Sequence, residues 1–585
     1  MRKGNATTKA RRPEGRHEED QGSLFFVFSC LRGPGLVLVC ALALTSAPAL
    51  AATKAIRAGR LVDATGKTQT NVVIVVDNDR IASVGTGAPP AGAEVIDLSR
   101  YTIIPGLIDL HTHMTYYWDR RPGTRPLGQP RRPAGVTTVL AADNARRTLE
   151  TGVTTVRDLG AANEVDYAMR DLINMGRMAG PRMFVAGQGL SAPRGGGAPN
   201  PDSYRQQAEA RIAAGSDWVK VYGSRGSYQS VDTTQTLTFD EMKAAVDAAH
   251  ARGRPVAIHS YGPSGVKDAV RAGADSIEHG IDLDDETLAD MAKRGTVWVP
   301  TIDHNRYYVE AKDEFGFAPE TIPPLQDFIA KNLESTRRAF KAGVKIGMGS
   351  DAVYTMFGQN SRELGWFIKA GMTPAQALAT ATTIPAALLG HASDLGAVAP
   401  GYFADIVAVE GDPLADIGVV IDKVRWVMKG GDIVVDRRAG TAGGAGTAGG
   451  AGGAGTAAEK EIRDVVERVL LHLGDHQWDA VANDLAPKSI VVVARERDGQ
   501  WTNSFQTGDE WLAALRRNPN PTTFREPITN VSVTIDNDRL AYLRADFQVM
   551  RDGKAQSHGV DEFTLVREGG AWRLAVIAYT SLPAR

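Results

Sequence analysis

Short apolar runs in the middle of the sequence end in side chains that bind metal ions. The first run ends in His111-x-His113, and because residues i and i+2 of a strand point to the same face, both imidazoles project together. Imidazoles and carboxylates are ligands of zinc and related divalent ions, so the pattern predicts a metal centre. The further runs carry Lys220 in WVKVYG, His259 in VAIHSYG, His279 in SIEHG and Asp351 in GMGSDA.

The elements that must hold these side chains follow one recurring order: an amphipathic helical stretch, a glycine and a short apolar strand. A glycine just after a helix, followed at once by a buried strand, is the connection found in parallel sheets. With the run at 107–113, eight such units over roughly 280 residues predict a (β/α)8 barrel of class α/β, whose active site lies at the carboxyl ends of the strands. A doubly wound sheet fits the same order of elements. The glycines are Gly152, Gly180, Gly215, Gly253, Gly273, Gly295 and Gly343.

Two β-rich segments flank the predicted barrel, at 54–104 and 397–437. Because the chain ends of a domain often lie close together, we expect both segments to pair in one small β-sandwich. A Gly/Ala/Thr tract at 440–456 offers no apolar anchor and predicts a flexible linker. The expected domains are a small β-sandwich at 52–104 and 395–438, a barrel with the predicted metal centre at 105–394, a linker at 439–456 and a further domain at 457–585.

Residues 1–51 have the features of a signal peptide. The apolar run at 36–44 precedes Ala49-Leu50-Ala51, a small-x-small motif, so we expect cleavage before Ala52 and export to the periplasm or the medium. The run is too short to span a bilayer, and no stable membrane anchor is expected. Both cysteines, Cys30 and Cys40, lie in this segment, so the metal ligands must come from His, Asp, Glu or a modified Lys.

Composition excludes several classes of function. The 66 basic and 68 acidic residues give a formal net charge of −2, which leaves no basic excess for nucleic acid. Hydrophobic residues make up 43% and charged residues 23%, as in an ordinary globular chain. The expected partner is therefore a small molecule or a short peptide, and composition leaves homo-oligomerisation open.

Four longer phrases resemble the amidohydrolase superfamily, in particular its imidazolonepropionase-like and Xaa-Pro dipeptidase branch. They are IIPGLIDLHTHM, LETGVTTVRDLG, SIEHG and PGYFADIVAVEGDPL, and the resemblance extends over residues 54–438. It implies a barrel with a small β-sandwich built from both flanks, and an enzyme that hydrolyses carbon–nitrogen bonds with the help of metal ions.

The resemblance also implies two divalent ions, with zinc as the expected metal, and a lysine carboxylated by CO2 that bridges them. A protonated lysine beside two dications would be repelled, whereas a carbamate supplies anionic oxygens. Asp351 would take a proton from the bridging water and pass it to the leaving nitrogen, so Asp351 and Lys220 are the implied catalytic residues. The implied ligands are His111, His113 and Asp351 for one ion, His259 and His279 for the other, and Lys220 for both.

Substrate contacts depend on fewer residues. Related dipeptidases place a tyrosine of the loop after the fourth strand against the substrate, which indicates Tyr228 in GSRGSYQS. Arg225 in this loop could pair with a carboxylate, and His304 after the seventh strand is expected to face the pocket. The expected reaction releases the C-terminal residue of dipeptides or N-acyl amino acids. The alternatives are hydrolysis of an ochratoxin-type or other small-molecule amide, and a catalytically silent ligand-binding relative.

The C-terminal part resembles the nuclear-transport-factor-2-like (SnoaL-like) domains over residues 457–582. An amphipathic helix and a shorter one precede five strand candidates, SIVVVARE, ITNVSVTID, LAYLRADFQVMRD, HGVDEFTLVRE and AWRLAVIAYTS. Two helices followed by a curved antiparallel sheet form the α+β cone of that family, whose members bind small molecules, dimerise or catalyse. The sequence assigns no chemistry to this domain.

Overall fold

The computed structural model describes residues 53–63, 65–118, 123–130, 132–161, 163–193, 197–226, 231–438, 457–498, 500–517, 522–536 and 539–584. The predicted signal peptide, the predicted linker and Tyr228 lie outside these residues and stay predictions. Among the described helices, none combines the length and the apolar character that a membrane span needs.

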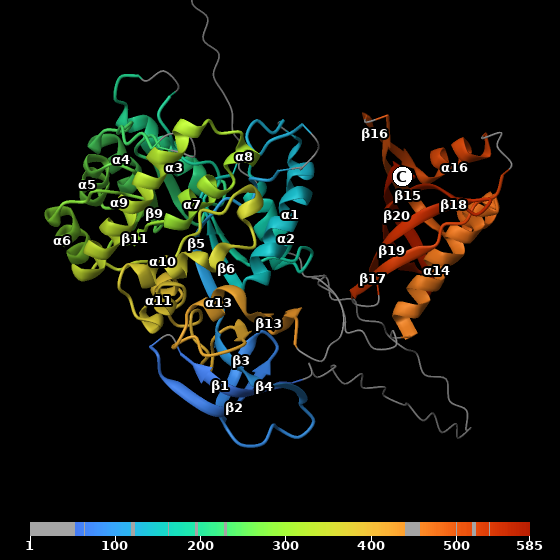
Figure 1. Cartoon of the computed structure of the whole chain (residues 1–585), viewed down its shortest axis with the longest axis horizontal. Coiled ribbons are helices and arrows are strands. Elements are labelled where there is room, and N and C mark those ends of the chain that lie inside the picture. Colours follow the sequence, from blue (N-terminus) through green and yellow to red (C-terminus); the bar gives the residue numbers. More distant parts are fainter. Residues whose placement is uncertain are drawn as a thin grey trace, which may run out of the picture. The chain divides into compact units, whose positions relative to one another are not determined.

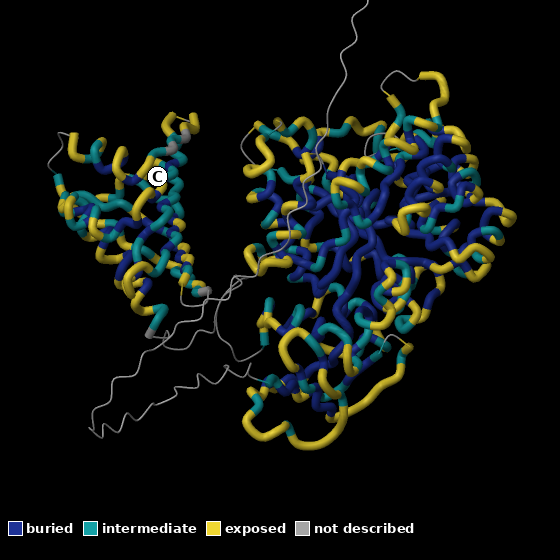
Figure 2. The backbone as a smooth tube through the Cα atoms, turned by 180° about the vertical axis from the view of Figure 1, so that it is seen from behind, coloured by how far each residue is buried: buried dark blue, intermediate teal, exposed yellow. Residues whose placement is uncertain are grey.

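Seven short parallel strands form the wall of the barrel: β5 (Leu107–Thr112), β6 (Val153–Asp158), β7 (Arg182–Val185), β8 (Val219–Tyr222), β9 (Val256–His259), β10 (Ser276–Glu278) and β11 (Val297–Val299). They pair in two sheets with the orders β5–β6–β7 and β8–β9–β10–β11. Helices surround them in Figure 1, and the buried residues in Figure 2 concentrate along the strands. Because both faces are covered, the strands appear in the sequence as short apolar runs rather than as alternating patterns.

Backbone hydrogen bonds join these two sheets into a closed barrel. The segment 344–352, where the sequence predicts the eighth strand, lies between β11 and β5 but pairs with them only through single bridges at Ile346 and Ala352. It therefore completes the barrel without being a regular strand. The joining bonds run from Leu190 N to Lys220 O (2.8 Å), from Trp298 N to Lys345 O (2.9 Å), from Leu110 N to Met348 O (2.9 Å) and from Asp351 N to His111 O (2.7 Å).

The helices of this part of the chain are α1 (Ala134–Glu150), α2 (Val165–Asn174), α3 (Pro201–Ala213), α4 (Phe239–His250), α5 (Pro263–Ala272), α6 (Asp285–Arg294), α7 (Ile302–Glu310), α8 (Lys312–Phe315), α9 (Ile322–Lys341), α10 (Glu363–Lys369), α11 (Pro374–Thr380), α12 (Thr383–Leu388) and α13 (Gly418–Asp422). Thr238 and Glu241 form a reciprocal capping box at the start of α4. Six of the seven predicted glycines have a positive φ, between 67° and 107°, as expected after a helix. Gly180 is not among the glycines with a positive φ. It lies in a closely packed place instead, where a Cβ would lie 2.5 Å from Ile173 Cδ1 and 3.1 Å from Ala145 Cβ.

Both flanks pair in one seven-stranded sheet, as expected. Its strands in spatial order are β14 (Asp432–Asp436), β13 (Val424–Lys429), β12 (Ile406–Val409), β4 (Glu94–Pro105), β1 (Lys54–Val62), β2 (Thr68–Asp77) and β3 (Arg80–Thr86). The flanks meet where β12 pairs antiparallel with β4. Ile81 N donates to Tyr402 O (2.9 Å), close to the start of β12, so the sheet curls around a core that includes Ile56, Ile103 and Trp426.

Residues 457–584 form an α+β domain around a core of their own, which includes Val466, Phe563 and Trp572. Its helices are α14 (Ala457–Gly474), α15 (Trp478–Asp484) and α16 (Gly508–Arg516). Its sheet has the order β16 (Gln500–Thr507), β15 (Leu485–Arg497), β20 (Ala571–Pro583), β19 (Lys554–Glu568), β18 (Leu540–Arg551) and β17 (Ile528–Asp536). Strand β16 and helix α16 were not predicted from the sequence. QWTNSFQT is mostly polar, and the capping box of Thr507 and Glu510 at the start of α16 was the signal that could have indicated the helix.

One acidic side chain is buried in this C-terminal sheet. Asp561 of β19 is 2% exposed and lies opposite Tyr579 of β20. Burial, with a further contribution from the neighbouring carboxyl group of Glu526, raises the pKa of Asp561. Burial raises the pKa of Glu526 as well, so the two carboxyl groups act as a pair that favours a bound proton. The sequence did not indicate this pair.

Asp109 of β5 holds this strand to the segment that closes the barrel. Its buried carboxylate accepts hydrogen bonds from Ser350 N (2.9 Å), Ser350 Oγ (2.5 Å) and Asn360 Nδ2 (3.0 Å). Asp109→Ala leaves these donors unpaired at about 1–3 kcal/mol each, so we expect the free energy of unfolding to fall by at least about 2 kcal/mol. Urea unfolding followed by circular dichroism measures this loss. Asp97→Ala, at an exposed position of β4, is the matched control, and an equal loss in both variants would contradict the prediction.

Candidate metal centre

The six side chains that the sequence predicts as metal ligands converge at the carboxyl ends of the barrel strands. All are buried, between 1% and 7% exposed. Their ring centroids are 5.3 Å apart for His111 and His113, 5.2 Å for His111 and His279, and 4.5 Å for His259 and His279. Three of the six residues lie within strands: His111 in β5, Lys220 in β8 and His259 in β9. His113 follows β5 and His279 follows β10 directly, and Asp351 lies in the segment 344–352.

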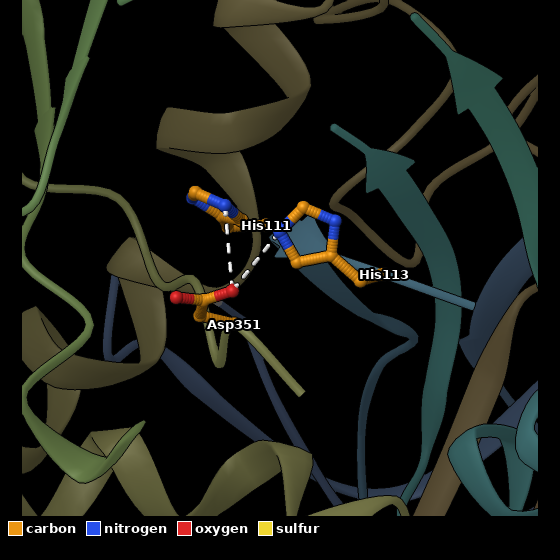
Figure 3. Close-up of side chains that lie close together, drawn as sticks. All are labelled: His111, His113 and Asp351. Carbon is orange, nitrogen blue, oxygen red and sulfur yellow. Dashed lines mark ion pairs between the residues drawn. The ribbon is translucent and has the colours of Figure 1, made fainter. Parts of the chain in front are cut away.

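Three of these side chains already have the spacing of metal ligands (Figure 3). Asp351 Oδ1 lies 3.6 Å from His111 Nε2 and 3.2 Å from His113 Nε2. Two nitrogen ligands of a tetrahedral zinc ion, each at ~2.0–2.1 Å from the metal, are roughly 3.3 Å apart. The ligand atoms of all three residues lie within 4.8 Å of one another, the one such group among the residues that the structure describes. The donor set therefore fits a divalent ion.

Hydrogen bonds from Nδ1 orient the rings of His111 and His113. His113 Nδ1 donates to Gly160 O at 3.2 Å, because a carbonyl oxygen can only accept. His111 Nδ1 donates to Glu278 Oε2 at 2.8 Å. In the neutral form of each ring, Nε2 then carries the lone pair and faces Asp351 Oδ1. Partners of this kind fix the tautomer and orientation of metal-binding histidines.

Burial sets the protonation states that metal binding requires. It lowers the pKa of His111 to about 4 and that of His259 to about 3, so both rings are neutral at pH 7. Burial opposes ionisation of Asp351, but the neighbouring histidines, His304 first, hold its pKa well below the usual range. Burial opposes protonation of His113, but its hydrogen bond and charge interaction with Asp351 raise its pKa above the usual value. A cation that binds here therefore displaces a proton from His113, whereas His111 and His259 offer neutral rings.

The amine of Lys220 is buried. Its Nζ has no hydrogen bond to any described residue, and it lies 5.2 Å from the ring centroid of Tyr222. Burial lowers the pKa of Lys220 to about 8, so about a tenth of the amine is neutral at pH 7, far more than for an ordinary lysine. Gly189 makes room for it, because a Cβ there would lie 3.0 Å from Lys220 Cγ.

Two of the candidate ligands have a strained backbone. His279 has φ 69° and Asp351 has φ 50°, in the left-handed region that non-glycine residues rarely adopt. Such strain costs about 1–3 kcal/mol and concentrates at functional sites. Backbone hydrogen bonds hold both residues: His279 N donates to Val299 O (2.8 Å), and Asp351 N donates to His111 O (2.7 Å).

The predicted substrate-binding residues differ in their surroundings. His304, near the start of α7, lies with Nε2 3.2 Å from Asp351 Oδ2, so it belongs to the polar centre itself. Arg225 is largely exposed (67%) and lies 3.5 Å from Asp232 Oδ2, while its carbonyl oxygen is 3.4 Å from His259 Nε2. Tyr228 lies outside the described residues.

Three residues of the centre are missing from the sequence-based set. Tyr116 stacks on His113 with 4.7 Å between ring centroids, and nothing in its local sequence indicates this. Glu278 and Arg157 form a fully buried ion pair with a distance of 2.7 Å. A charged residue inside the apolar runs ADSIEHG and VTTVRDLG was the available signal, because a buried charge needs a partner.

His113→Ala tests the compact group directly. The variant loses one of three ligands, so we expect its affinity for Zn2+ to fall by more than about 100-fold, beyond the 10–100-fold typical of losing a residue that only supports a ligand. Competition with a chromophoric chelator measures the affinity. His250→Ala is the matched control, since His250 lies on α4 beside Asp275 and should leave metal binding unchanged. Wild-type affinity in His113→Ala would rule out this ligand set.

Comparison with known proteins agrees with this architecture. Residues 102–434 match the model of the amidohydrolase family, and residues 455–577 match that of the SnoaL-like domain. The ochratoxinase of Aspergillus niger is 28% identical to this chain over 373 residues, which cover 56% of this chain and 74% of that enzyme.

Solved structures of similar proteins share the fold. A Xaa-Pro dipeptidase with methionine bound in its active site superposes with a TM-score of 0.60 and 31% identity, covering 65% of this chain and 99% of the dipeptidase. A prolidase in complex with N-methylphosphonate-L-proline gives a TM-score of 0.60 and 27% identity, covering 66% of this chain and all of the prolidase. The barrel, the flanking sheet and these matches together show that the chain belongs to the amidohydrolase family and carries a SnoaL-like domain in its C-terminal part.

Proposed function

We propose that this protein is a binuclear metal-dependent hydrolase that releases the C-terminal residue of dipeptides or N-acyl amino acids outside the cytoplasm. The observation that carries the proposal is the convergence of His111, His113 and Asp351 at ligand spacing, close to other buried histidines. Similarity to proteins named dipeptidase, prolidase and ochratoxinase supports an amide bond as the target. The predicted signal peptide favours an extracellular substrate.

Bound divalent ions, with zinc favoured by the nitrogen and oxygen donors, would polarise the amide carbonyl and lower the pKa of water toward about 7. The residues that would hold them are His111, His113 and Asp351 for one ion, His259 and His279 for the other, and Lys220 for both. The neutral amine of Lys220 would add to CO2 and release one proton, which gives a carbamate whose two oxygens share one negative charge. The lowered pKa of Lys220 and its lack of a hydrogen-bond partner among the described residues support this modification.

Asp351 would move the proton in the reaction. Its carboxylate is ionised in the folded protein, and Oδ1 faces the histidine pair while Oδ2 contacts His304 at 3.2 Å. It would accept a proton from the attacking water and deliver it to the leaving nitrogen. A carboxylate held from both sides needs little reorganisation for this transfer.

An ochratoxin-type amide, between an aromatic acid and an amino acid, is the second candidate substrate. The observation in its favour is an aromatic group beside the centre. Tyr116 stacks on His113, is 38% exposed and lies 6.2 Å from Tyr354 by ring centroids. An exposed aromatic ring next to a metal ligand could stack on a planar acyl group.

Lys220→Ala tests the shared ligand. Without the carbamate we expect metal content to fall from about two ions per chain to about one, and a short carboxylic acid such as propionate to restore part of the activity. Elemental analysis of the dialysed protein measures the ions. Lys243→Ala, at an exposed lysine of α4 paired with Asp247, is the control. Two tightly bound ions and normal turnover in Lys220→Ala would exclude the carbamate.

A dipeptide and its C-terminal amide test the substrate class. A charge-assisted hydrogen bond to the free carboxylate is worth about 1.5–3 kcal/mol, so the amide should be hydrolysed roughly 10–150-fold less efficiently by kcat/KM. Arg225→Met should narrow this difference if Arg225 makes the contact. Arg271→Met, at an arginine of α5 paired with Glu286 (2.9 Å), should leave it unchanged. Equal rates for acid and amide would reject carboxylate recognition and leave a general amidase.

A further inference from the structure

Arg157 of β6 and Glu278 of β10, which directly precedes His279, lie inside the barrel and have no part in the proposed reaction. Both side chains are 0% exposed. Arg157 donates through Nη2 to Glu278 Oε1 (2.7 Å), through Nη1 to Ser276 Oγ (2.8 Å) and through Nε to Leu110 O (2.6 Å). One guanidinium group therefore ties β6 to β5 and β10, at the residues that directly precede His111 and His279.

The second oxygen of Glu278 contacts a candidate ligand. Oε1 already accepts from Arg157 and from Ser276 Oγ (2.5 Å), which leaves Oε2 for the Nδ1–H of His111 at 2.8 Å. The guanidinium fixes the carboxylate from the other side, so Glu278 cannot rotate away without losing two bonds. His111 thus has one orientation in which Nδ1 donates and Nε2 points to Asp351.

We infer that Glu278, clamped by Arg157, is a positioning residue that sets the tautomer and orientation of His111 for metal binding. The inference depends on the metal centre of the proposed function. A purely structural ion pair is the competing explanation, because removing one partner of a buried pair leaves an uncompensated charge and destabilises the fold whatever else the pair does. A structural pair, however, needs only its two partners, whereas here the carboxylate also bonds a ligand ring.

Glu278→Gln separates these explanations, because an amide has one oxygen and one NH2 group. With NH2 toward Arg157 Nη2, two donors face each other, so this arrangement is disfavoured. With NH2 toward His111, the ring must accept at Nδ1 and carry its proton on Nε2, the nitrogen that should bind the metal. The favoured arrangement therefore changes the tautomer of His111, although the side chain keeps its size.

Two measurements read the effect without relying on activity. Chelator competition should show a 10–100-fold loss of Zn2+ affinity in Glu278→Gln, the usual effect of removing a hydrogen bond to a metal-binding histidine. Nitrogen chemical shifts of 15N-histidine-labelled, metal-free protein should show His111, assigned with His111→Ala, moving from the Nδ1–H form toward the Nε2–H form. A change in tautomer is not expected from a role in stability alone.

Glu363→Gln is the matched control. Glu363 is also a fully buried carboxylate of the barrel, and it accepts hydrogen bonds from Ile302 N (2.9 Å) and Asp303 N (2.8 Å) at the start of α7. The same loss of an acceptor should lower its thermal stability but leave Zn2+ affinity and the His111 signals unchanged. If Glu278→Gln behaves like this control, the ion pair is structural and the inference is wrong.

Arg157→Lys covers the case in which Glu278→Gln does not fold. Lysine keeps the positive charge, but one ammonium group cannot reach Leu110 O, Ser276 Oγ and Glu278 Oε1 together. We expect a smaller loss of Zn2+ affinity with both tautomers of His111 present, and wild-type values would overturn the inference. Failure of the wild-type protein to bind Zn2+ would instead reject the proposed function, so the two outcomes are distinguishable.

Discussion

The hydrogen bond from Asp351 N to His111 O, 2.7 Å long, closes the barrel, and the rest of the site depends on that closure. It joins the first strand of the barrel to the segment that takes the place of the eighth. Only after this closure can the carboxylate of Asp351 face the imidazoles of His111 and His113. The buried bonds between Asp109 and Ser350 secure the same junction, which allows Asp351 to hold its left-handed backbone.

Charge balance inside the barrel is the second constraint. A low-dielectric interior penalises an unpaired charge, and the structure meets this by pairing Arg157 with Glu278 and by lowering the pKa of His111 and His259, which keeps both rings neutral at pH 7. At the centre lie the carboxylate of Asp351, which raises the pKa of His113, and the amine of Lys220, whose Nζ has no hydrogen-bond partner among the described residues. Divalent cations and a carbamate would balance these charges, which links the electrostatics of the fold to the proposed chemistry.

The C-terminal domain has a hydrophobic core of its own. Its core draws only on residues 457–584 among those described, and its sheet joins the first and last of its long strands in parallel, β15 with β20. This sheet also contains a buried acidic side chain, Asp561, and burial raises the pKa of its carboxyl group. Among the described residues, the core of the barrel and the core of this domain share no side chain.

The sequence by itself determined the features that repeat locally. Glycine followed by an apolar strand predicted the order of the barrel units, and His-x-His on a strand predicted two imidazoles on one face. These features could be predicted because helix and strand periodicities need only near neighbours. The flanking runs likewise indicated strands, and QWTNSFQT escaped detection because it lacks such a pattern.

Tertiary structure alone decided which partners meet. No local pattern says that β12 pairs antiparallel with β4, that His304 contacts Asp351, or that the carboxylate of Glu278 reaches across the barrel to His111. These contacts join residues far apart in the sequence, and their geometry exists only once the strands have registered around a closed wall. The sequence thus specified which side chains are available for a metal ion, and the fold decided which nitrogen of each ring faces it, because a ring's orientation depends on its partner across the barrel.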